Sequence, residues 1–226
     1  MAGVTVQAMV VGRGGAVLAR ARRVIAGGAH LSLAGRSCAV APATPLAALI
    51  AVRHSGGPAF TLRDYGRCDS SPADSSQLFV TSVGGQHNAG QDGWVYKAEG
   101  IAGSTGAADP SGALGNGRRL RVGAKVLWFY CHMGLAGGCQ RTLEVLPQSG
   151  TVAAGAPLQV SVTGEDDEGA AALVAGATVT LGTSTATSLA PGGVATVIAP
   201  TVPGRYQLSA SGPGLVPSFP VAVQVR

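Results

Sequence analysis

KVLWFYCHM, residues 125–133, decides the fold class of this chain. The run is short and rich in β-branched and aromatic residues, a composition typical of a β-strand. Three similar runs precede it, namely AFTLRDYG at 59–66, LFVTSVGG at 78–85 and GWVYKAEG at 93–100. Each is bounded by Gly, Pro, Asn or Asp, which favour turns. The pattern predicts a series of short strands.

A hairpin and one helix are predicted before these strands. VTVQAMVV at 4–11 and AVLARARRVI at 16–25 are β-rich and are joined by GRGG, which favours a hairpin. In APATPLAALIAV at 41–52, Thr44 is a good N-cap residue and Pro45 suits the first helical position. Leu46, Leu49 and Ile50 then share one face of a short helix.

Composition excludes several classes of protein. Gly 35 and Pro 13 together make about a fifth of the 226 residues, and charged residues are only 12%, which argues against helical bundles and coiled coils. Hydrophobic residues are 46%, enough to fill a core. No apolar run approaches the roughly 18 residues of a membrane span, so we expect no transmembrane segment.

Charge is distributed unevenly along the chain. Residues 1–146 contain 14 basic and 7 acidic side chains, whereas residues 147–226 contain 2 basic and 4 acidic ones. The two parts therefore differ in net sign, which indicates two units. The basic clusters are Arg20, Arg22 and Arg23, and Arg118, Arg119 and Arg121. No stacking aromatic residues alternate with these arginines, so we do not expect a nucleic-acid partner.

The second unit is predicted to be all β. From Pro147 onward aromatic residues nearly vanish and Thr, Val, Ala and Gly alternate. Turn clusters separate the segments at intervals close to those of a β-sandwich. The segments are PLQVSVTG, ATVTLG, GVATVIA, GRYQLSAS and PVAVQVR. We therefore expect a first domain at 1–146 and a β-sandwich at 147–226.

Four cysteines, Cys38, Cys68, Cys131 and Cys139, lie in the first part. An even number favours two disulfides and an exported protein. Of three pairings, the Gly-rich segment between Cys131 and Cys139 favours joining these two, which leaves Cys38 with Cys68. The cysteines form no CxxC pair, so no metal site is predicted. We expect an extracellular or cell-surface location and interpret Met1 as standing in place of a removed signal peptide.

The first part resembles the transcobalamin C-terminal-like family over residues 4–131. The resemblance is carried by GWVYKAEG, the Gly-rich loop after it, and RLRVGAKVLWFYC at 119–131. The matching residues are Gly93, Trp94, Tyr96, Gly123, Val126, Trp128, Phe129 and Tyr130. The resemblance implies a β-grasp-type α+β domain. Because vertebrate members help to enclose cobalamin, it also implies a small-molecule binder as one functional alternative.

The second part resembles bacterial Ig-like modules. AGATVTLG at 175–182 matches a common strand entry. PGRYQLSA at 203–210 places Tyr206 in a Gly-x-Tyr context similar to the tyrosine corner. Such modules usually act as spacers, stalks or adhesive units, which is what the resemblance implies here.

An aromatic patch is the first candidate site. Trp94 and Tyr96 share one face of their strand by period two, as do Trp128 and Tyr130 of theirs. If the two strands are neighbours, all four side chains gather together. Two interpretations stay open, a flat stacking surface that binds a ligand, or core anchors in a domain otherwise short of large side chains.

The loop GGQHNAGQDGW at 84–94 is the second candidate. Its polar residues are Gln86, His87, Asn88, Gln91 and Asp92, and its glycines allow close approach of the backbone to another molecule. We expect these five residues at the rim of the aromatic patch. A plain connecting loop is the alternative.

The function predicted is non-catalytic binding or adhesion at the cell surface. The sequence contains no G-x-S-x-G, HExxH or P-loop motif, so no catalytic residue and no cofactor are predicted. The expected partner is a surface macromolecule. One alternative is a structural subunit in which segments 4–11 and 220–225, or the sandwich edge, pair with another copy in a filament or layer. The other is the cobalamin-like binder.

Overall fold

The computed structural model describes residues 3–68, 71–113, 119–135 and 137–226. The chain divides into two compact units, Met1–Cys139 and Gln140–Arg226, and each is described by itself. Strands hold 49% of the chain and helices 8%. The predicted fold class, mainly β with one short α-helix in the described residues, is confirmed.

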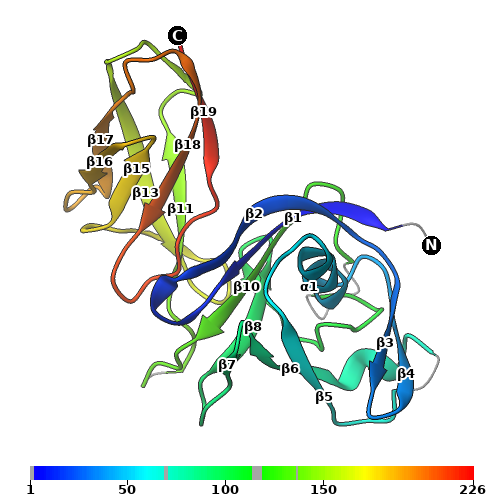
Figure 1. The fold of residues 1–226 in the computed structure, drawn as a ribbon. Coiled ribbons are helices and arrows are strands. Elements are labelled where there is room, and N and C mark those ends of the chain that lie inside the picture. Colours follow the sequence, from blue (N-terminus) through cyan, green and yellow to red (C-terminus); the bar gives the residue numbers. More distant parts are fainter. Residues whose placement is uncertain (1–2, 69–70, 114–118, 136) are drawn as a thin grey trace. The chain divides into compact units, whose positions relative to one another are not determined.

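The first unit is a β-rich domain with one α-helix among its described residues (Figure 1). Its elements are β1 (Val4–Val11), the 3-10 turn η1 (Arg13–Gly15), β2 (Val17–Ala26), β3 (Ala29–Leu33), β4 (Arg36–Val40), α1 (Pro45–His54), β5 (Phe60–Asp64), the 3-10 turn η2 (Asp74–Gln77), β6 (Leu78–Val83), β7 (Gln86–His87), β8 (Gly93–Ala98), β9 (Ile101–Ala102) and β10 (Lys125–Cys131).

The main sheet of this unit has the strand order β2-β1-β10-β8-β9. Strands β1 and β10 are far apart in the sequence, yet they run parallel and side by side, with Val10 opposite Trp128 (Figure 1). The other neighbours in the sheet are antiparallel. Helix α1 packs against β1, β2 and β10. One helix on a mixed sheet with a parallel central pair is the predicted β-grasp-type arrangement.

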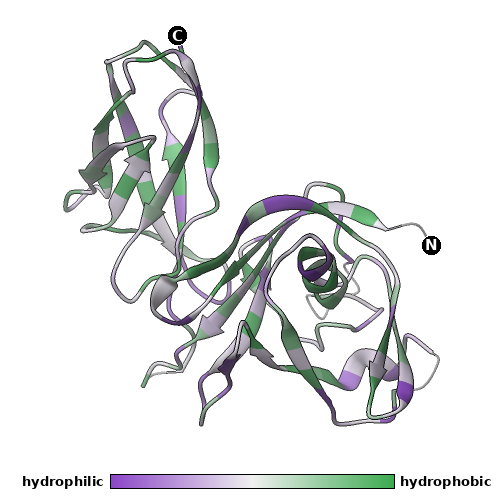
Figure 2. Ribbon diagram, viewed as in Figure 1, coloured by the Kyte–Doolittle hydropathy of each residue, from purple (hydrophilic) through white to green (hydrophobic). Residues whose placement is uncertain are grey.

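Helix α1 begins where the sequence predicts. The Ala47 amide donates to Thr44 Oγ1 at 3.2 Å, and Thr44 Oγ1 donates to the Ala41 carbonyl at 2.9 Å. This cap satisfies a backbone group that no earlier turn can reach. Leu46, Leu49 and most other residues of the helix are buried, and Figure 2 shows α1 as mainly hydrophobic. No helix in the described ranges is long and apolar enough to cross a membrane.

Two small sheets complete the first unit. Among the described strands, β3 pairs with β4 alone, through a tight hairpin, and β5, β6 and β7 form an antiparallel sheet of their own. One disulfide joins Cys38 of β4 to Cys68, which follows β5. The other joins Cys131 at the end of β10 to Cys139. Both disulfides have the pairing that the sequence favours.

The second unit is a sandwich of two sheets. β13 pairs with β11 on one side and with β14 and β17 on the other, and the second sheet has the order β12-β19-β18-β15-β16. The strands are β11 (Thr142–Pro147), β12 (Thr151–Val152), β13 (Pro157–Glu165), β14 (Ala171–Leu173), β15 (Thr178–Leu181), β16 (Ser184–Thr187), β17 (Val194–Ile198), β18 (Gly204–Ser211) and β19 (Val221–Val225).

Alternating burial builds the core of this sandwich. Along β13, Leu158, Val160 and Val162 are buried while Gln159 points outward, as expected for a sheet that covers a core on one face. The Tyr206 hydroxyl donates to the Val202 carbonyl at 2.9 Å. This backbone contact a few residues upstream is the one expected of a tyrosine corner.

The division between the units lies at 139/140, seven residues before the predicted boundary at 146/147. Strand β11 explains the difference, because Thr142 pairs with Glu165 and Pro147 with Val160 of β13. The change in composition at Pro147 marks the end of the first strand of the sandwich rather than the start of the unit.

The terminal segments lie inside their sheets, although not along their whole length. β1 lies between β2 and β10, and the β10 partner covers its residues 7–11. This corrects the expectation that segment 4–11 offers an open strand edge to another copy of the chain. β19 lies between β18 and β12, but β12 pairs only with Gln224 and Val225. Pairing of segment 220–225 with another copy stays a prediction.

Candidate functional site

The four predicted aromatic residues meet, but in the core. β8 pairs with β10 in the register that sets Tyr96 opposite Trp128 and Trp94 opposite Tyr130. The ring centroids are 5.5 Å apart in the first pair and 5.8 Å in the second. All four side chains are between 1% and 6% exposed. They pack as core anchors and do not form a flat exposed surface; direct ligand contact by them stays a prediction.

The polar atoms of these aromatic residues have partners inside the domain. Trp128 Nε1 donates to the Pro45 carbonyl at 3.0 Å, and Trp94 Nε1 donates to the Gln86 carbonyl at 2.7 Å. The Tyr96 hydroxyl lies 2.8 Å from the Thr105 carbonyl, and burial raises its pKa. Buried polar groups satisfied in this way hold the rings in place.

Two side chains of loop 86–92 fasten it to neighbouring segments of the domain. Gln86 Oε1 accepts from the Arg13 amide at 2.7 Å. Asn88 Nδ2 donates to the Val80 carbonyl, and Asn88 Oδ1 accepts from the Trp94 amide. Gln86 and Asn88 therefore tie the loop to backbone groups of neighbouring segments, and these bonds hold the loop in place without a ligand.

Asp92 ties the loop to the end of β10. Its Oδ1 accepts from the Met133 amide at 2.9 Å, and its Oδ2 lies 2.8 Å from His132 Nδ1. The hydrogen bond from His132, followed by that from the Met133 amide, lowers the pKa of the Asp92 carboxyl below its ordinary value of 3.8. A lowered pKa means that the folded protein favours the ionised carboxylate.

The anchoring by Asp92 predicts an acid-dependent loop. A depressed carboxyl pKa contributes stability that is complete above the ordinary value of 3.8 and is lost as the pH falls through the lowered pKa. We expect the Met133 amide resonance to shift in that acidic range. In Asp92→Asn, which has no carboxyl to titrate, the resonance should stay constant there. An unchanged titration in the variant would contradict the assignment.

His87 and Gln91 are the members of the predicted set whose side chains are exposed. The His87 carbonyl accepts from Arg13 Nη2 at 2.7 Å and from the Tyr130 hydroxyl at 3.1 Å. These bonds fix the backbone and leave the imidazole at the surface. The structure thus separates the loop into bracing residues and two side chains free to face a partner.

Loop 86–92 borders an open groove of about 450 Å³. Its far wall consists of Arg63, Tyr65 and Phe79, which the sequence analysis did not select. Tyr65 is 60% exposed and Phe79 46% exposed, and their rings meet edge to face at 6.0 Å. The Arg63 guanidinium lies over the Tyr65 ring at 4.8 Å. We call this site, with His87 and Gln91 on its loop side, the Tyr65–Phe79 groove.

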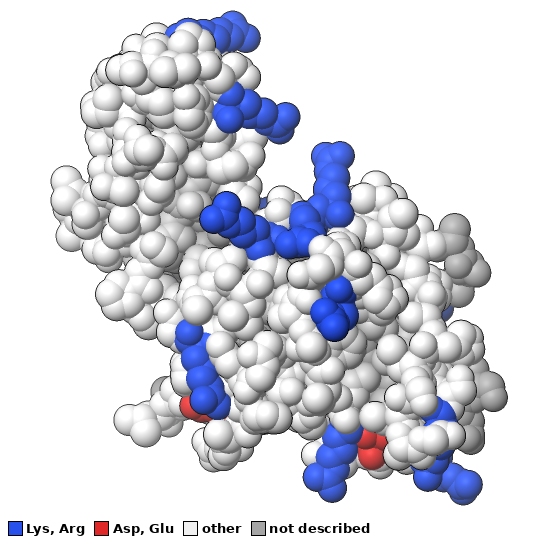
Figure 3. All heavy atoms as spheres, in the orientation of Figure 1, with Lys and Arg blue, Asp and Glu red and all other residues white. Residues whose placement is uncertain are grey.

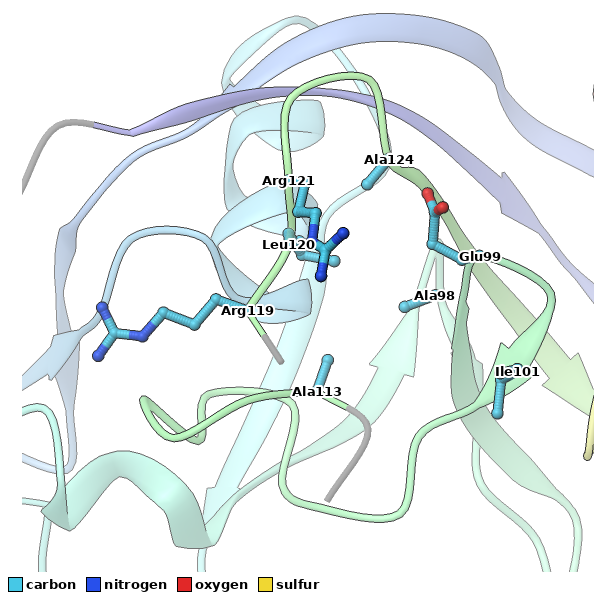
Figure 4. A pocket seen from close by; sticks show the side chains of 8 residues that line it. All are labelled: Ala98, Glu99, Ile101, Ala113, Arg119, Leu120, Arg121 and Ala124. Carbon is cyan, nitrogen blue, oxygen red and sulfur yellow. The ribbon is translucent and has the colours of Figure 1, made fainter. Parts of the chain in front are cut away.

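A second pocket is smaller and lies beside β8 and β10. Its volume is about 140 Å³, and Glu99 accepts from the Lys125 amide near it. Figure 4 shows Arg119 extending away from Glu99, so the pocket does not gather its charges around one point. Its lining residues are Ala98, Glu99, Ile101, Ala113, Arg119, Leu120, Arg121 and Ala124.

The basic clusters do not line the Tyr65–Phe79 groove. Arg20, Arg22 and Arg23 lie on β2, where Arg22 Nη1 donates to the Ser55 carbonyl at 2.7 Å. Figure 3 shows that some basic side chains on the visible face of this unit lie next to one another and others stand apart. Arg118 lies outside the described residues.

The structure also bears on metal binding. Within the described ranges, no group of three or more His, Cys, Asp or Glu side chains could hold a metal ion. Cys131 is joined to Cys139, so its sulfur is not available as a thiolate ligand.

Comparisons with known proteins leave the family open. No protein-family model matches the chain, and no curated protein matches it. Among solved structures, the D00-D0 domain of intimin is similar at 16% sequence identity with a TM-score of 0.28, covering 66% of this chain and 90% of that one. A likeness at this level decides nothing about function, which has to be argued from the groove and its loop.

Proposed function

We propose that this protein is an exported, non-catalytic binding protein that attaches to a surface macromolecule through the Tyr65–Phe79 groove. The observation that carries the proposal is an exposed aromatic pair, with an arginine stacked on it, beside a loop braced by its own side chains. Tyr, Phe and Arg are enriched at protein interfaces, and Tyr and Arg recur among the residues that dominate binding. This composition favours a protein partner. Two disulfides support an extracellular location.

Rigidity of the groove supports binding rather than turnover. Asp92 has a lowered pKa and Tyr96 a raised one. Each of them bonds to the protein's own backbone, which is a bracing role. A surface whose loop is already ordered loses less conformational entropy when a partner docks.

The domain assignment is part of the same proposal. One helix against the β1, β2 and β10 strands supports a transcobalamin C-terminal-like domain, and the two-sheet unit with its Tyr206 contact supports an Ig-like module. In this arrangement the first domain provides the contact surface. The Ig-like module serves as a spacer that holds it away from the cell.

The aromatic pair provides the test. In Tyr65→Ala and Phe79→Ala we expect the melting temperature to change little, because both side chains are largely exposed. Binding should weaken by about 2 kcal/mol in each variant, or about thirtyfold in Kd. The measurement is biosensor binding to a panel of purified extracellular proteins and cell-wall polysaccharides.

Ile25→Ala is the matched control, because Ile25 is 65% exposed and does not line the groove. It should bind like the wild type. The proposal is contradicted if the wild type binds nothing in the panel, or if the Tyr65 and Phe79 variants bind as tightly as the wild type. Binding to polysaccharides alone would overturn the choice of a protein partner.

A further inference from the structure

A second groove, separate from the first, runs between β3 and β5. Its volume is about 550 Å³, and α1 contributes to its wall. Leu31, Leu33, Phe60 and Leu62 line it, are half-buried and pack against the domain core, and Ile50 of α1 lies beside them. No residue of β4 or β6 lines it. The groove therefore follows the edges of β3 and β5 that face away from their hydrogen-bonded partners.

The β3 edge leaves backbone groups unpaired. In the register of this hairpin, His30 stands opposite Ala39 and Ser32 opposite Ser37. The Ala39 carbonyl accepts from Ser75 Oγ at 2.5 Å, so it points away from β3. Residues of an antiparallel pair alternate between facing each other and facing outward. The amides and carbonyls of His30 and Ser32 therefore point away from β4.

The outer edge of β5, like that of β3, leaves backbone groups unpaired. At its ends, the Gly84 amide donates to the Ala59 carbonyl and the Tyr65 amide donates to the Gln77 carbonyl. These two contacts fix which residues of β5 face β6. By alternation, Phe60 and Leu62 turn their amides and carbonyls toward the opposite side.

No described strand pairs with either of these two edges. β3 and β5 belong to different sheets. Outside the ladders with β4 and β6, no backbone hydrogen bond reaches residues 29–33 or 60–64 from any other described residue. Two free edges along one apolar groove are the template on which an added strand pairs.

We propose that this groove binds an extended peptide segment of a partner protein, which inserts as a strand between β3 and β5 and joins the two small sheets into one. Such a segment pairs with His30 and Ser32 on one side and with Phe60 and Leu62 on the other. Five residues, about 17 Å of strand, match the length of each edge. Alternate apolar side chains of the segment face Leu31, Leu33 and Ile50.

The charge of the groove wall favours some peptide segments over others. The groove wall contains Arg53 and His54 from the last turn of α1 and contains no Asp or Glu. A segment with a carboxylate at that end complements the wall, because the Arg53 guanidinium is exposed there. The expected partner sequence is thus a short alternating apolar strand with an acidic residue.

The probe is a random peptide library displayed on phage and selected on the full chain. Enriched peptides should alternate apolar and polar residues and include an acidic one. Amide hydrogen exchange locates binding. In the free protein the amides of His30, Ser32, Phe60 and Leu62 should exchange much faster than those of Leu31 and Arg63, which face their ladder partners, and a selected peptide should protect them.

Three exchange results would overturn the proposal. Protection of the four outward amides in the dilute free chain would mean that the edges are closed. Protection that rises with protein concentration alone would assign the groove to a second copy of this chain. Peptides that bind without slowing these amides would place binding elsewhere.

Proline substitution provides the matched variants. Ser32→Pro removes an outward amide at the groove, whereas Ser37→Pro removes the outward amide of the opposite residue, on the far edge of β4. We expect peptide affinity to fall by about tenfold or more in the first variant and to stay unchanged in the second. Equal affinity in both variants, with the fold of each verified by circular dichroism, would contradict strand insertion.

Discussion

Trp128→Ala is expected to unfold the first unit or leave it barely stable. Trp128 is 2% exposed, lies against Tyr96 and donates to the Pro45 carbonyl at the start of α1. Truncation of a buried tryptophan removes apolar contacts, leaves a cavity and here also orphans a carbonyl, with a cost of about 3–5 kcal/mol. Because domains have total stabilities of about 5–15 kcal/mol, this loss is a large fraction.

Thermal unfolding followed by near-ultraviolet circular dichroism measures the effect. Trp94→Ala should behave similarly, since Trp94 is buried and bonded to Gln86. Tyr65→Ala is the control that removes an aromatic ring from the surface. A Trp128→Ala protein with an unchanged melting temperature would show that the aromatic cluster is a surface site after all.

Replacing Cys38 and Cys68 together by serine is expected to give the second-largest loss. The bond closes a loop with a sequence separation of 30, for which loop-closure entropy predicts about 3.5 kcal/mol. Both cysteines are fully buried, so two hydroxyl groups would also enter the core. Urea unfolding of the double variant measures the difference in free energy.

The other disulfide is the internal comparison. Cys131 and Cys139 are separated by only 8 residues, and the same model gives about 2.5 kcal/mol. The double variant of this pair should therefore be the more stable of the two. The reverse order would mean that the longer loop retains structure when unfolded and that chain entropy does not explain the ranking.

Short sequence signals predict the elements whose ends are marked by cap or turn residues. Thr44 and Pro45 mark the start of α1, and the β-rich runs on both sides of GRGG mark the first hairpin, because caps and turns depend on neighbouring residues alone. The β3–β4 hairpin was not predicted. Its turn is Ala34-Gly35 with positive φ at both residues, and alanine gives no turn signature of the Asn-Gly kind.

The candidate site was predicted only in part, for a physical reason. Period two places Trp94 with Tyr96 and Trp128 with Tyr130 on shared faces, but which face a helix covers is a tertiary property. Polar residues such as Asn88 were found from composition, yet their bonds to the domain's own backbone depend on the folded register.

The contact between Tyr65 and Phe79 cannot be predicted from the sequence of one strand alone. Phe79 alternates with buried Leu78 and Val80, so period two turns it outward. Its contact with Tyr65 follows from the β5–β6 register, which sets Arg63 opposite Phe79. A single strand read alone does not reveal this pairing.

Mass spectrometry of the protein from its native source, under native and then denaturing conditions, tests the central claim most directly. A disulfide-bonded, exported protein that binds a macromolecule should appear as a bare monomer, lighter by four hydrogens than after reduction. Additional small mass would instead support the cobalamin-like binder, and multiples of the chain would support a structural subunit. Four free thiols would contradict the exported assignment on which the account depends.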